Sequence, residues 1–504
     1  MANIKCMRYI RKFINKRKII KEDLFKSKEL LDNVNGYSLD KKQRLAVIDS
    51  SDSALLLAGA GSGKTLTIVG KIRYLIEILK IKKEDILCIS FTNDSVNSLK
   101  NTLLKNYNYD IDVFTFHKLA LNILKNNKNI VNIASSDELD YIITEYFYSN
   151  FSGLNILEKK EEFYELKKLI GTFINLFKSN NYDYIKFGEI LRKLKYGNDY
   201  IFIKIVRKIY FEYMSELKSK NEVDFNDMIN DAIKVLNKGG KIKPYKYIII
   251  DEYQDTSDIQ ETFINLISNN NVYMVGDVKQ SIYRFRNANP DIFKDKYLNY
   301  SNHNGGKKID LLKNFRSRSE VLDDINGIFN IIMDTDIGGA DYKATHQMIF
   351  GNSTYTENHP NQNFNLEIYN YKREDKKYSF AEYEAFIIAN DIKNKINSGY
   401  QVIDKKTSKL REANYGDFCI LIDRKSNFDL YKKIFEYLSI PLVIYYDEKI
   451  TNEKDVLIIK NIIDMVIKIY NNTYDEKFKY DFYSIARSYL FNMSDNDYVE
   501  LYIN

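Results

Sequence analysis

Short apolar runs alternate with longer stretches of helical spacing along the first half of the chain. Because helical stretches separate these runs, they are typical of the strands of a parallel sheet that helices cover on both faces. The pattern therefore predicts an α/β fold. The runs are ALLLA (54–58), ILCISF (86–91), IDVFTF (111–116), YIIID (247–251) and VYMVGD (272–277).

The same pattern divides the rest of the chain. From Lys118 to about Asn226, apolar residues recur at helical spacing, which predicts a helical insertion in the α/β domain. The stretch HNGGKK (303–308) is a linker candidate, because glycine pairs interrupt periodic structure. Strand-like runs follow it and predict a second α/β unit: NLEIYNY (365–371), FCILID (418–423) and IPLVIYY (440–446).

These runs define the expected domains. They are a basic N-terminal extension (1–36), a first α/β domain in two parts (37–117 and 227–302), the helical insertion (118–226), a second α/β domain (303–447) and the start of a further helical region (448–504).

Composition limits the class of protein. The chain has 504 residues, which is too long for one compact core. No apolar run approaches the roughly 20 residues of a membrane span, and the start lacks the apolar core of a secretory signal. We therefore expect a cytoplasmic protein without a membrane partner. The cysteines and histidines are scattered, which argues against a disulfide framework or a zinc cage.

Charge alone does not identify a partner. The net charge of +6 permits nucleic-acid binding without requiring it. Basic residues cluster over residues 5–21 and alternate with apolar ones at near-helical spacing. This segment is consistent with a solvated amphipathic helix and equally with one that contacts phosphates.

A glycine-rich turn joins the first strand to a helix in ALLLAGAGSGKTLT (54–67). Small residues let backbone N–H groups surround a polyphosphate, Lys64 supplies positive charge, and the Thr65 hydroxyl can ligate magnesium. The segment matches a phosphate-binding loop (P-loop) with Ala58 in place of the first glycine. The expected nucleotide-binding residues are Ala58, Gly59, Ala60, Gly61, Ser62, Gly63, Lys64 and Thr65.

Two adjacent carboxylates end the apolar run in YKYIIIDEYQD. A P-loop requires a neighbouring strand that ends in an acid holding magnesium, and Asp251 fits this role. Glu252 is then placed to orient or deprotonate the attacking water. The alternative is an exposed acidic loop.

Two further segments suggest what the nucleotide energy serves. Gln43 lies upstream of the P-loop, and its amide can read the edge of adenine. In GDVKQSIYRFRNANP (276–290), aromatic residues alternate with arginines after Gln280, a combination that suits stacking on single-stranded bases.

Eight short segments, in the same order along the chain as the family's motifs, resemble those of UvrD-like superfamily 1A DNA helicases. The chain is closest to the helicase-IV branch around the P-loop and to the AddA branch of helicase–nuclease subunits in the last two segments. The resemblance implies a P-loop NTPase with RecA-like parallel-sheet motor domains and helical insertions. The segments are KKQRLAV, AGAGSGKT, SFTNDSVNSLK, FTFHKLA, VDFNDMI, DEYQDTSDIQ, GDVKQSIYRFR and LLKNFRSRSEV.

The resemblance also implies roles for single residues. Gln43 and Arg44 would select ATP, Gln280 would sense the γ-phosphate, and Arg316 would act as an arginine finger from the second α/β domain. With Lys64 and Glu252, Gln280 and Arg316 form the expected catalytic set, and Thr65 and Asp251 would hold Mg²⁺. The expected DNA-binding residues are Phe91, Thr92, His117, Tyr283, Phe285 and Arg286.

Simpler roles remain open for some of these residues: Phe91 can be core, His117 can cap or pack, and Arg44 can be solvated. Asp94 also stands where the family usually has a lysine, which should weaken one phosphate contact.

The resemblance covers the chain incompletely. The family's last two motifs, a glycine-rich loop and a second arginine finger, do not follow Arg316, and no nuclease domain is recognisable. We therefore expect part of a 3′–5′ helicase that moves along single-stranded DNA in repair or recombination, together with partner subunits. The alternative is an ATP-binding module that associates with DNA but has little unwinding activity.

Overall fold

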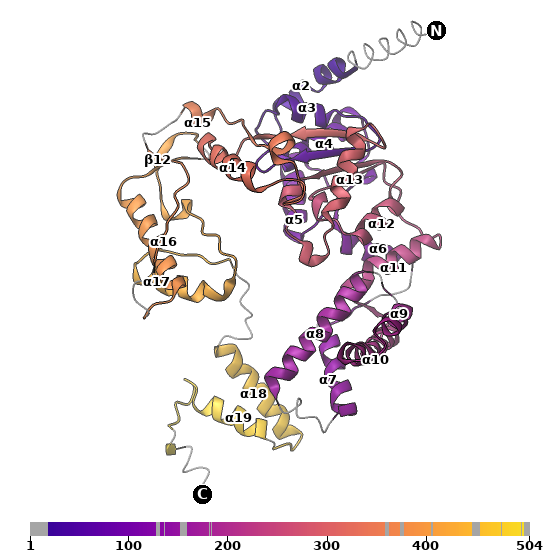
Figure 1. Ribbon diagram of the computed structural model, residues 1–504, viewed down its shortest axis with the longest axis vertical. Helices are drawn as coiled ribbons and strands as arrows, with labels where there is room; N and C mark the ends of the chain where they lie inside the picture. The colour runs from indigo at the N-terminus through magenta and orange to yellow at the C-terminus, as the bar shows by residue number, and fades with distance from the viewer. Residues whose placement is uncertain are drawn as a thin grey trace. The chain divides into compact units, whose positions relative to one another are not determined.

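The computed structural model describes residues 19–497 except 128–131, 136, 152–158, 181, 183, 358–361, 373–376, 405–406, 446–453, 475 and 495. Most of the basic 5–21 segment therefore lies outside the described residues. The chain divides into two compact units, Met1–Glu367 and Ile368–Asn504, which we describe separately (Figure 1). Among the described helices, none has both the length and the apolar character that a bilayer crossing requires.

A six-stranded parallel sheet forms the centre of the first unit, in the order β3-β2-β6-β7-β1-β8. The five strands expected from the apolar runs are all present, so the predicted α/β class is confirmed. The strands are β1 (Ala54–Ala58), β2 (Ile86–Ser90), β3 (Asp112–Thr115), β6 (Tyr247–Ile250), β7 (Val272–Gly276) and β8 (Lys307–Leu311).

Both faces of the central strands β1, β2, β6 and β7 are buried, which explains why these strands are mostly apolar, whereas the edge strands β3 and β8 are partly exposed and contain charged residues. In β1, Leu56 packs into one core cluster while Leu55 and Leu57 pack into the other, because successive strand residues point to opposite faces. Side chains of α3 (Lys41–Val47), α4 (Lys64–Arg73) and α5 (Asn93–Tyr107) fill the first cluster. The second cluster is filled from α6 (Phe116–Asn127), α11 (Phe225–Asn237), α12 (Asp258–Ile267) and α13 (Pro290–Ser301).

The expected N-terminal extension does not end at residue 36 in the structure. Leu30, Leu31 and Val34 are buried in the first core cluster, so the segment around α2 (Lys28–Asp32) belongs to the first unit. The hydrophobic effect favours burial of these apolar side chains in the core, which a separate extension exposed to solvent would not provide.

The expected change of domain at residue 303 does not occur there either. The strand that follows HNGGKK is β8, and it pairs in parallel with β1 from Ala54↔Lys307 to Ala58↔Leu311. The first unit continues to Glu367. The glycine pair is therefore part of a turn that leads the chain to the edge of the sheet. There, pairing with β8 satisfies the backbone N–H and C=O groups along one side of β1.

Short elements complete the first unit. They are η1 (Tyr74–Ile78), η2 (Lys83–Asp85), η4 (Tyr253–Asp255), η5 (Val278–Gln280), η6 (Arg284–Arg286), β9 (Lys313–Asn314), α14 (Ser319–Ile332), η7 (Tyr342–His346), β10 (Ile349–Phe350) and α15 (Thr354–Glu357).

The region expected as a helical insertion is helical and has its own aromatic-rich core, in which Phe177, Phe187 and Tyr210 lie close together. A short parallel pair of strands lies at its base. Its elements are β4 (Asn132–Ile133), α7 (Glu138–Phe151), α8 (Lys160–Ser179), α9 (Tyr184–Leu194), α10 (Asn198–Ser219) and β5 (Glu222–Val223).

A buried lysine joins this helical insertion to the sheet-covering helix α11. Lys178, on α8, has a fully buried side chain whose Nζ lies 2.5 Å from Asp224 and 2.7 Å from Asp227. Asp224 caps the N-terminus of α11, and Tyr213 of α10 donates its hydroxyl to the same carboxylate (2.9 Å). Burial raises the pKa of Asp227 to about 6, although the Lys178 ammonium acts in the opposite direction. Three helices thus meet at one ion cluster.

The second unit contains less regular structure than the sequence predicts. The runs 365–371 and 418–423 and the described part of 440–446 form no strand; Phe418, Ile420 and Ile422 pack instead against a small core around Phe435. A short apolar run covers helices as readily as it pairs in a sheet, so the predicted strands were wrong here. The elements are α16 (Phe380–Asn397), β11 (Gln401–Ile403), β12 (Leu410–Glu412), η8 (Tyr415–Asp417), η9 (Lys425–Asn427), α17 (Phe428–Tyr437), α18 (Lys454–Tyr470) and α19 (Glu476–Ala486).

The buried ion cluster predicts a large stability effect. Lys178→Met keeps the aliphatic stem but leaves Asp224 and Asp227 without their cation, which should lower the free energy of unfolding by about 3–5 kcal/mol. Urea unfolding followed by circular dichroism measures this change. As a control, Lys168→Met removes an exposed partner of Glu165 on the same helix and should change stability by less than about 1 kcal/mol. Equal effects of the two substitutions would contradict a structural role for the cluster.

Candidate functional site

The glycine-rich turn lies between β1 and α4, as the sequence predicts. Gly63 has left-handed backbone (φ 79°) at the N-cap of α4 and offers no side chain to cap the first-turn amides. Gly59 N–H donates to Leu311 O of the edge strand β8 (3.1 Å). The N-terminus of α4, where backbone N–H groups and the helix dipole favour an anion, therefore opens onto the loop.

Two of these glycines are required by close neighbours as well as by their backbone. A Cβ on Gly61 (φ 67°) would lie 2.6 Å from Asn314 Nδ2, and one on Gly63 would lie 2.6 Å from Gln43 Nε2. Asn314 donates to Ala60 O (2.8 Å), and Phe315 N–H donates to Gly61 O (2.9 Å). The segment after β8 thus supports the loop from one side. Asn314 was not singled out by the sequence, where it is one polar residue in LLKNFRS.

Gln43 supports the loop from α3. Its Nε2 donates to Ser62 O (2.8 Å), its Oε1 accepts the Asp40 N–H (2.8 Å), and the residue is buried. Arg44 on the same helix donates to Asp32, Ser38 and Leu39 O. Both side chains therefore have partners within the protein. A role for them in selecting adenine remains a prediction.

The carboxylates of DEYQD face the P-loop across the sheet. Asp251 extends β6 by one hydrogen bond, from its N–H to Ile89 O (2.9 Å), and Glu252 follows in left-handed backbone (φ 51°). Lys64 Nζ lies 2.5 Å from Glu252 Oε2. The strands β1 and β6 thus bring together residues that are 188 positions apart in the sequence.

The electrostatics of this site favour a cation. Burial, and then the negative charge of Glu252, raise the pKa of Asp251 to about 6, while Lys64 acts in the opposite direction. The pKa of Asp255 is raised to about 6 by the same two causes. Carboxylates that burial and mutual repulsion push toward protonation are stabilised by a nearby divalent ion. The chemistry of these residues therefore fits magnesium, and the expected role of Asp251 and Thr65 in holding it remains a prediction.

A glutamine for which the sequence predicted no role connects DEYQD to the next strand end. Gln254 is buried; its Nε2 donates to Glu252 Oε2 (2.9 Å) and its Oε1 accepts the Asp277 N–H (2.9 Å). The fully buried Asp277 in turn accepts from Gln280 Nε2 (2.8 Å) and Lys279 Nζ (2.8 Å). The expected γ-phosphate sensor Gln280 is therefore linked to Glu252 through the side chain of Gln254 and both the backbone N–H and the carboxylate of Asp277. In the sequence, the position of Gln254 within DEYQD was the only indication that this residue belongs to the site.

Arg316 belongs to the same unit as the P-loop, not to a second domain as expected. The backbone N–H of Arg316 donates to Asn314 Oδ1 (2.8 Å), and Asn314 also donates to the P-loop carbonyl of Ala60. Arg316 itself is exposed. Because β8 leads directly from the central sheet to this turn, the chain has no opportunity to change domain before Arg316.

The expected DNA-binding aromatics gather on one side of the first unit. Phe91 stacks on Tyr283 with ring centroids 5.1 Å apart, and the Arg286 guanidinium lies 5.1 Å from the Tyr283 ring and 5.6 Å from the Phe285 ring. Phe285 is 74% exposed. Phe91 is half-buried at the end of β2, so it contributes a surface-facing ring and not only core.

Phe91, Phe285 and Arg286, but not Tyr283, line a pocket of about 540 Å³, which we call the aromatic–amide pocket. Its lining comprises Phe91, Phe116, His117, Thr172, Asn175, Leu176, Ser179, Phe225, Asn226, Ile229, Ser257, Ile259, Gln260, Phe285, Arg286 and Asn287.

Two of the residues expected to contact DNA, His117 and Thr92, have structural roles within the protein. His117 packs edge-on against Phe225 (5.8 Å), and burial lowers its pKa, so the neutral imidazole is favoured. Thr92 caps α5 by accepting the Ser95 N–H (3.2 Å). His117 lines the aromatic–amide pocket, whereas Thr92 is not among its lining residues.

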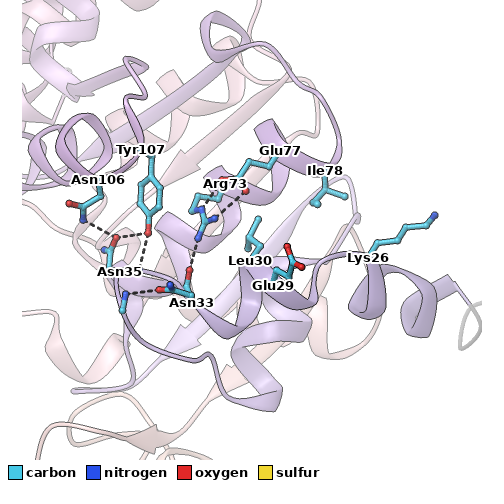
Figure 2. Close-up of a pocket in the computed structure, with 11 residues that line it drawn as sticks. Lys26, Glu29, Leu30, Asn33, Asn35, Arg73, Glu77, Ile78, Asn106 and Tyr107 are labelled. Atoms are coloured by element: carbon cyan, nitrogen blue, oxygen red, sulfur yellow. Dashed lines mark hydrogen bonds and ion pairs between the residues drawn. The ribbon is translucent and has the colours of Figure 1, made fainter.

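A second pocket, of about 630 Å³, lies away from both groups of residues, between the N-terminal segment and α4–α5 (Figure 2). Arg73 donates both to Glu77 and to Asn33 O, and Asn35 is bonded to Tyr107 and Asn106. Because Arg73, Glu77, Asn35, Asn106 and Tyr107 bond to one another or to the backbone, we assign this pocket no function.

Comparison with known proteins agrees with this geometry. A family model described as the UvrD/REP helicase N-terminal domain matches residues 39–301. The A subunit of the ATP-dependent helicase/nuclease of Staphylococcus haemolyticus is 30% identical over 379 residues, covering 71% of this chain and 30% of the relative. The protein of the same name from Bacillus cytotoxicus is 35% identical over 246 residues, covering 44% and 20%.

The chain therefore belongs to the UvrD/REP helicase family, and the resemblance to UvrD-like superfamily 1A helicases is confirmed. The similarity to these helicase/nuclease proteins agrees with the AddA-like interpretation of the later motifs. This chain spans about 30% or less of the length of these relatives.

The raised pKa of Asp251 predicts a pH-dependent gain in stability from Asp251→Asn. The folded pKa of about 6 exceeds the ordinary 3.8, so the folded state binds protons more tightly and the parent loses stability as pH rises from about 4 to 6. Without magnesium, the variant should be more stable than the parent by about 1–3 kcal/mol at pH 7.5 and equal to it near pH 3.5. Urea unfolding in a chelator across this range measures the difference. The control Asp110→Asn, at an exposed position, should show no such trend, and a gain independent of pH would contradict the assignment.

Proposed function

We propose that this chain contains the ATP-hydrolysing motor of a DNA helicase that moves 3′ to 5′ along single-stranded DNA in repair or recombination. The observation that carries the proposal is the P-loop facing DEYQD, with Lys64 and Glu252 in direct contact. Membership of the helicase family supports the proposal, and the name of its relatives, as one component of a helicase/nuclease, supports partner subunits.

ATP binding in this proposal would use the P-loop and the carboxylates that follow β6. The amides at the start of α4 and the Lys64 ammonium would bind the phosphates, while Asp251 and Thr65 would hold Mg²⁺. A magnesium ion held there would supply positive charge that favours phosphoryl transfer. Lys64 would exchange its contact with Glu252 for the phosphates, which frees the Glu252 carboxylate to accept a proton from water.

The remaining residues of the site would respond to the γ-phosphate. Gln280 is bonded to Asp277 and thereby to Gln254 and Glu252, so a hydrogen bond from Gln280 to phosphate would alter the whole chain of contacts. Arg316, on the turn held against the P-loop, would add positive charge to the transferring phosphoryl group.

The same segment leads to the proposed DNA site. Only two residues separate Gln280 from Tyr283, whose ring stacks on Phe91, and Phe285 and Arg286 follow directly. A change in the position of Gln280 would therefore move the rings on which bases stack. This short distance along the chain gives a physical route from hydrolysis to movement on DNA.

Two substitutions should separate nucleotide binding from hydrolysis. Lys64→Ala removes the cation that faces the phosphates and should weaken Mg²⁺-ATP binding strongly. Glu252→Gln removes the base and also releases Lys64, so ATP affinity should stay equal or rise while DNA-stimulated hydrolysis falls at least about 100-fold. Calorimetric titration and phosphate release measure the two properties. Parent-level turnover in Glu252→Gln would exclude this residue as the base, and unchanged affinity in Lys64→Ala would exclude the nucleotide site.

Two neighbouring substitutions should weaken DNA binding in different ways. Phe285→Ala should cost about 1–3 kcal/mol per stacked base with little change in salt dependence. Arg286→Ala should reduce the slope of log affinity against log salt by about one, because one phosphate contact is lost. Anisotropy of a labelled oligothymidine across a salt series distinguishes them. Parent affinity and slope in both variants would remove this segment from the DNA site.

A further inference from the structure

The aromatic–amide pocket has chemistry that suits a base better than a phosphate. Among the described residues that line it, Arg286 is the only arginine or lysine and none is a carboxylate. His117 also lines the pocket, and burial lowers the pKa of its imidazole and so favours the neutral form. The other polar groups of the lining are amides and hydroxyls. Two aromatic rings at the pocket, Phe285 and Phe225, are 74% and 60% exposed. Exposed rings beside neutral polar groups can stack on a base and hydrogen-bond its edge.

A pair of asparagines supplies the hydrogen-bonding edge. Asn226 Nδ2 of α11 donates to Asn175 Oδ1 of α8 (3.1 Å), and both residues line the pocket. The bond uses one N–H of Asn226 and the oxygen of Asn175, so the NH₂ group of Asn175 is left as a donor beside the oxygen of Asn226 as an acceptor. If both amides were turned over, the bond would reverse and again leave one donor and one acceptor. The pair therefore presents a donor beside an acceptor in either assignment.

The position of this pair is determined by the buried ion cluster beneath it. Asn175 lies one helical turn before Lys178, and Asn226 lies between Asp224 and Asp227, the two partners of that lysine. Asn287, next to Arg286, donates to Ser179 of the same helix α8. The two asparagines and the aromatic segment are thus held by rigid helices, which is the preorganisation that a hydrogen-bonding site needs.

We propose that Asn175 and Asn226 together bind the Watson–Crick edge of one unpaired base in the aromatic–amide pocket. Each of the four bases carries an adjacent donor and acceptor on that edge, so the pair recognises all of them. A base in a duplex has this edge occupied by its partner. The site therefore selects single-stranded DNA over duplex by direct hydrogen bonding, in addition to stacking. This inference rests on the proposed function, since it assumes that DNA enters this pocket.

The test uses N3-methylthymidine, which removes the N3–H donor and blocks the edge but leaves a ring that stacks. Anisotropy titrations compare an oligothymidine with an N3-methylated oligomer of equal length, using the full chain. The parent should bind the methylated oligomer about tenfold more weakly, because two hydrogen bonds of ordinary strength are lost. The double variant Asn175→Ala/Asn226→Ala should bind oligothymidine about tenfold more weakly than the parent and should bind both oligomers equally.

Controls separate this proposal from the general DNA-binding proposal. Asn237→Ala, at an exposed position at the end of α11, should keep the parent affinities and their ratio. Phe285→Ala should weaken binding of both oligomers and keep the ratio. Equal binding of the two oligomers by the parent, or an unchanged ratio in the double variant, would overturn the amide proposal while leaving DNA binding intact. Failure of the parent to bind oligothymidine at all would overturn both.

Discussion

The parallel order of β6, β7 and β1 is the constraint on which the candidate site depends, because it brings Lys64 into contact with Glu252. Lys64 follows β1 and Glu252 follows β6, and β7 lies between these strands. Because all three strands are parallel, their carboxyl ends meet at one edge, and the residues after each strand face one another. The close approach of a cation and two carboxylates is therefore a consequence of strand order and not of any local segment.

That arrangement brings polar groups into a largely buried environment, which raises the cost of leaving any of them without a partner. Gln254 and the fully buried Asp277 meet this requirement by forming hydrogen bonds that run from Glu252 to Gln280. On the other side of the P-loop, Asn314 and Gln43 contact its carbonyls. The loop is thus held by parts of the chain before and after it, and its shape does not depend on its own residues alone.

Buried polar groups also find partners in distant segments where the helical insertion joins the sheet domain. Lys178 neutralises two aspartates at the start of α11 while the neighbouring residues Asn175, Ser179 and Asn226 face the aromatic–amide pocket. A buried ion pair contributes little net stability compared with apolar packing, but it tolerates few alternative geometries. At this junction the ion cluster joins α8 to the start of α11, the two helices that carry Asn175 and Asn226.

The sequence by itself determined the five expected strands and the helical insertion, since burial on both sheet faces and helical periodicity leave direct patterns in residue order. It also indicated the P-loop and DEYQD, because their chemistry is concentrated in short segments. The strands expected in the second unit were wrong, since a short apolar run records burial but not its partner. Tertiary structure alone decided that β8 pairs with β1, that Arg316 stays beside the P-loop, and that Gln254, Asn314 and Lys178 hold distant segments together. Those contacts join residues far apart in the chain, and residue order carries no local signal for a hydrogen bond whose partner is supplied only by the fold.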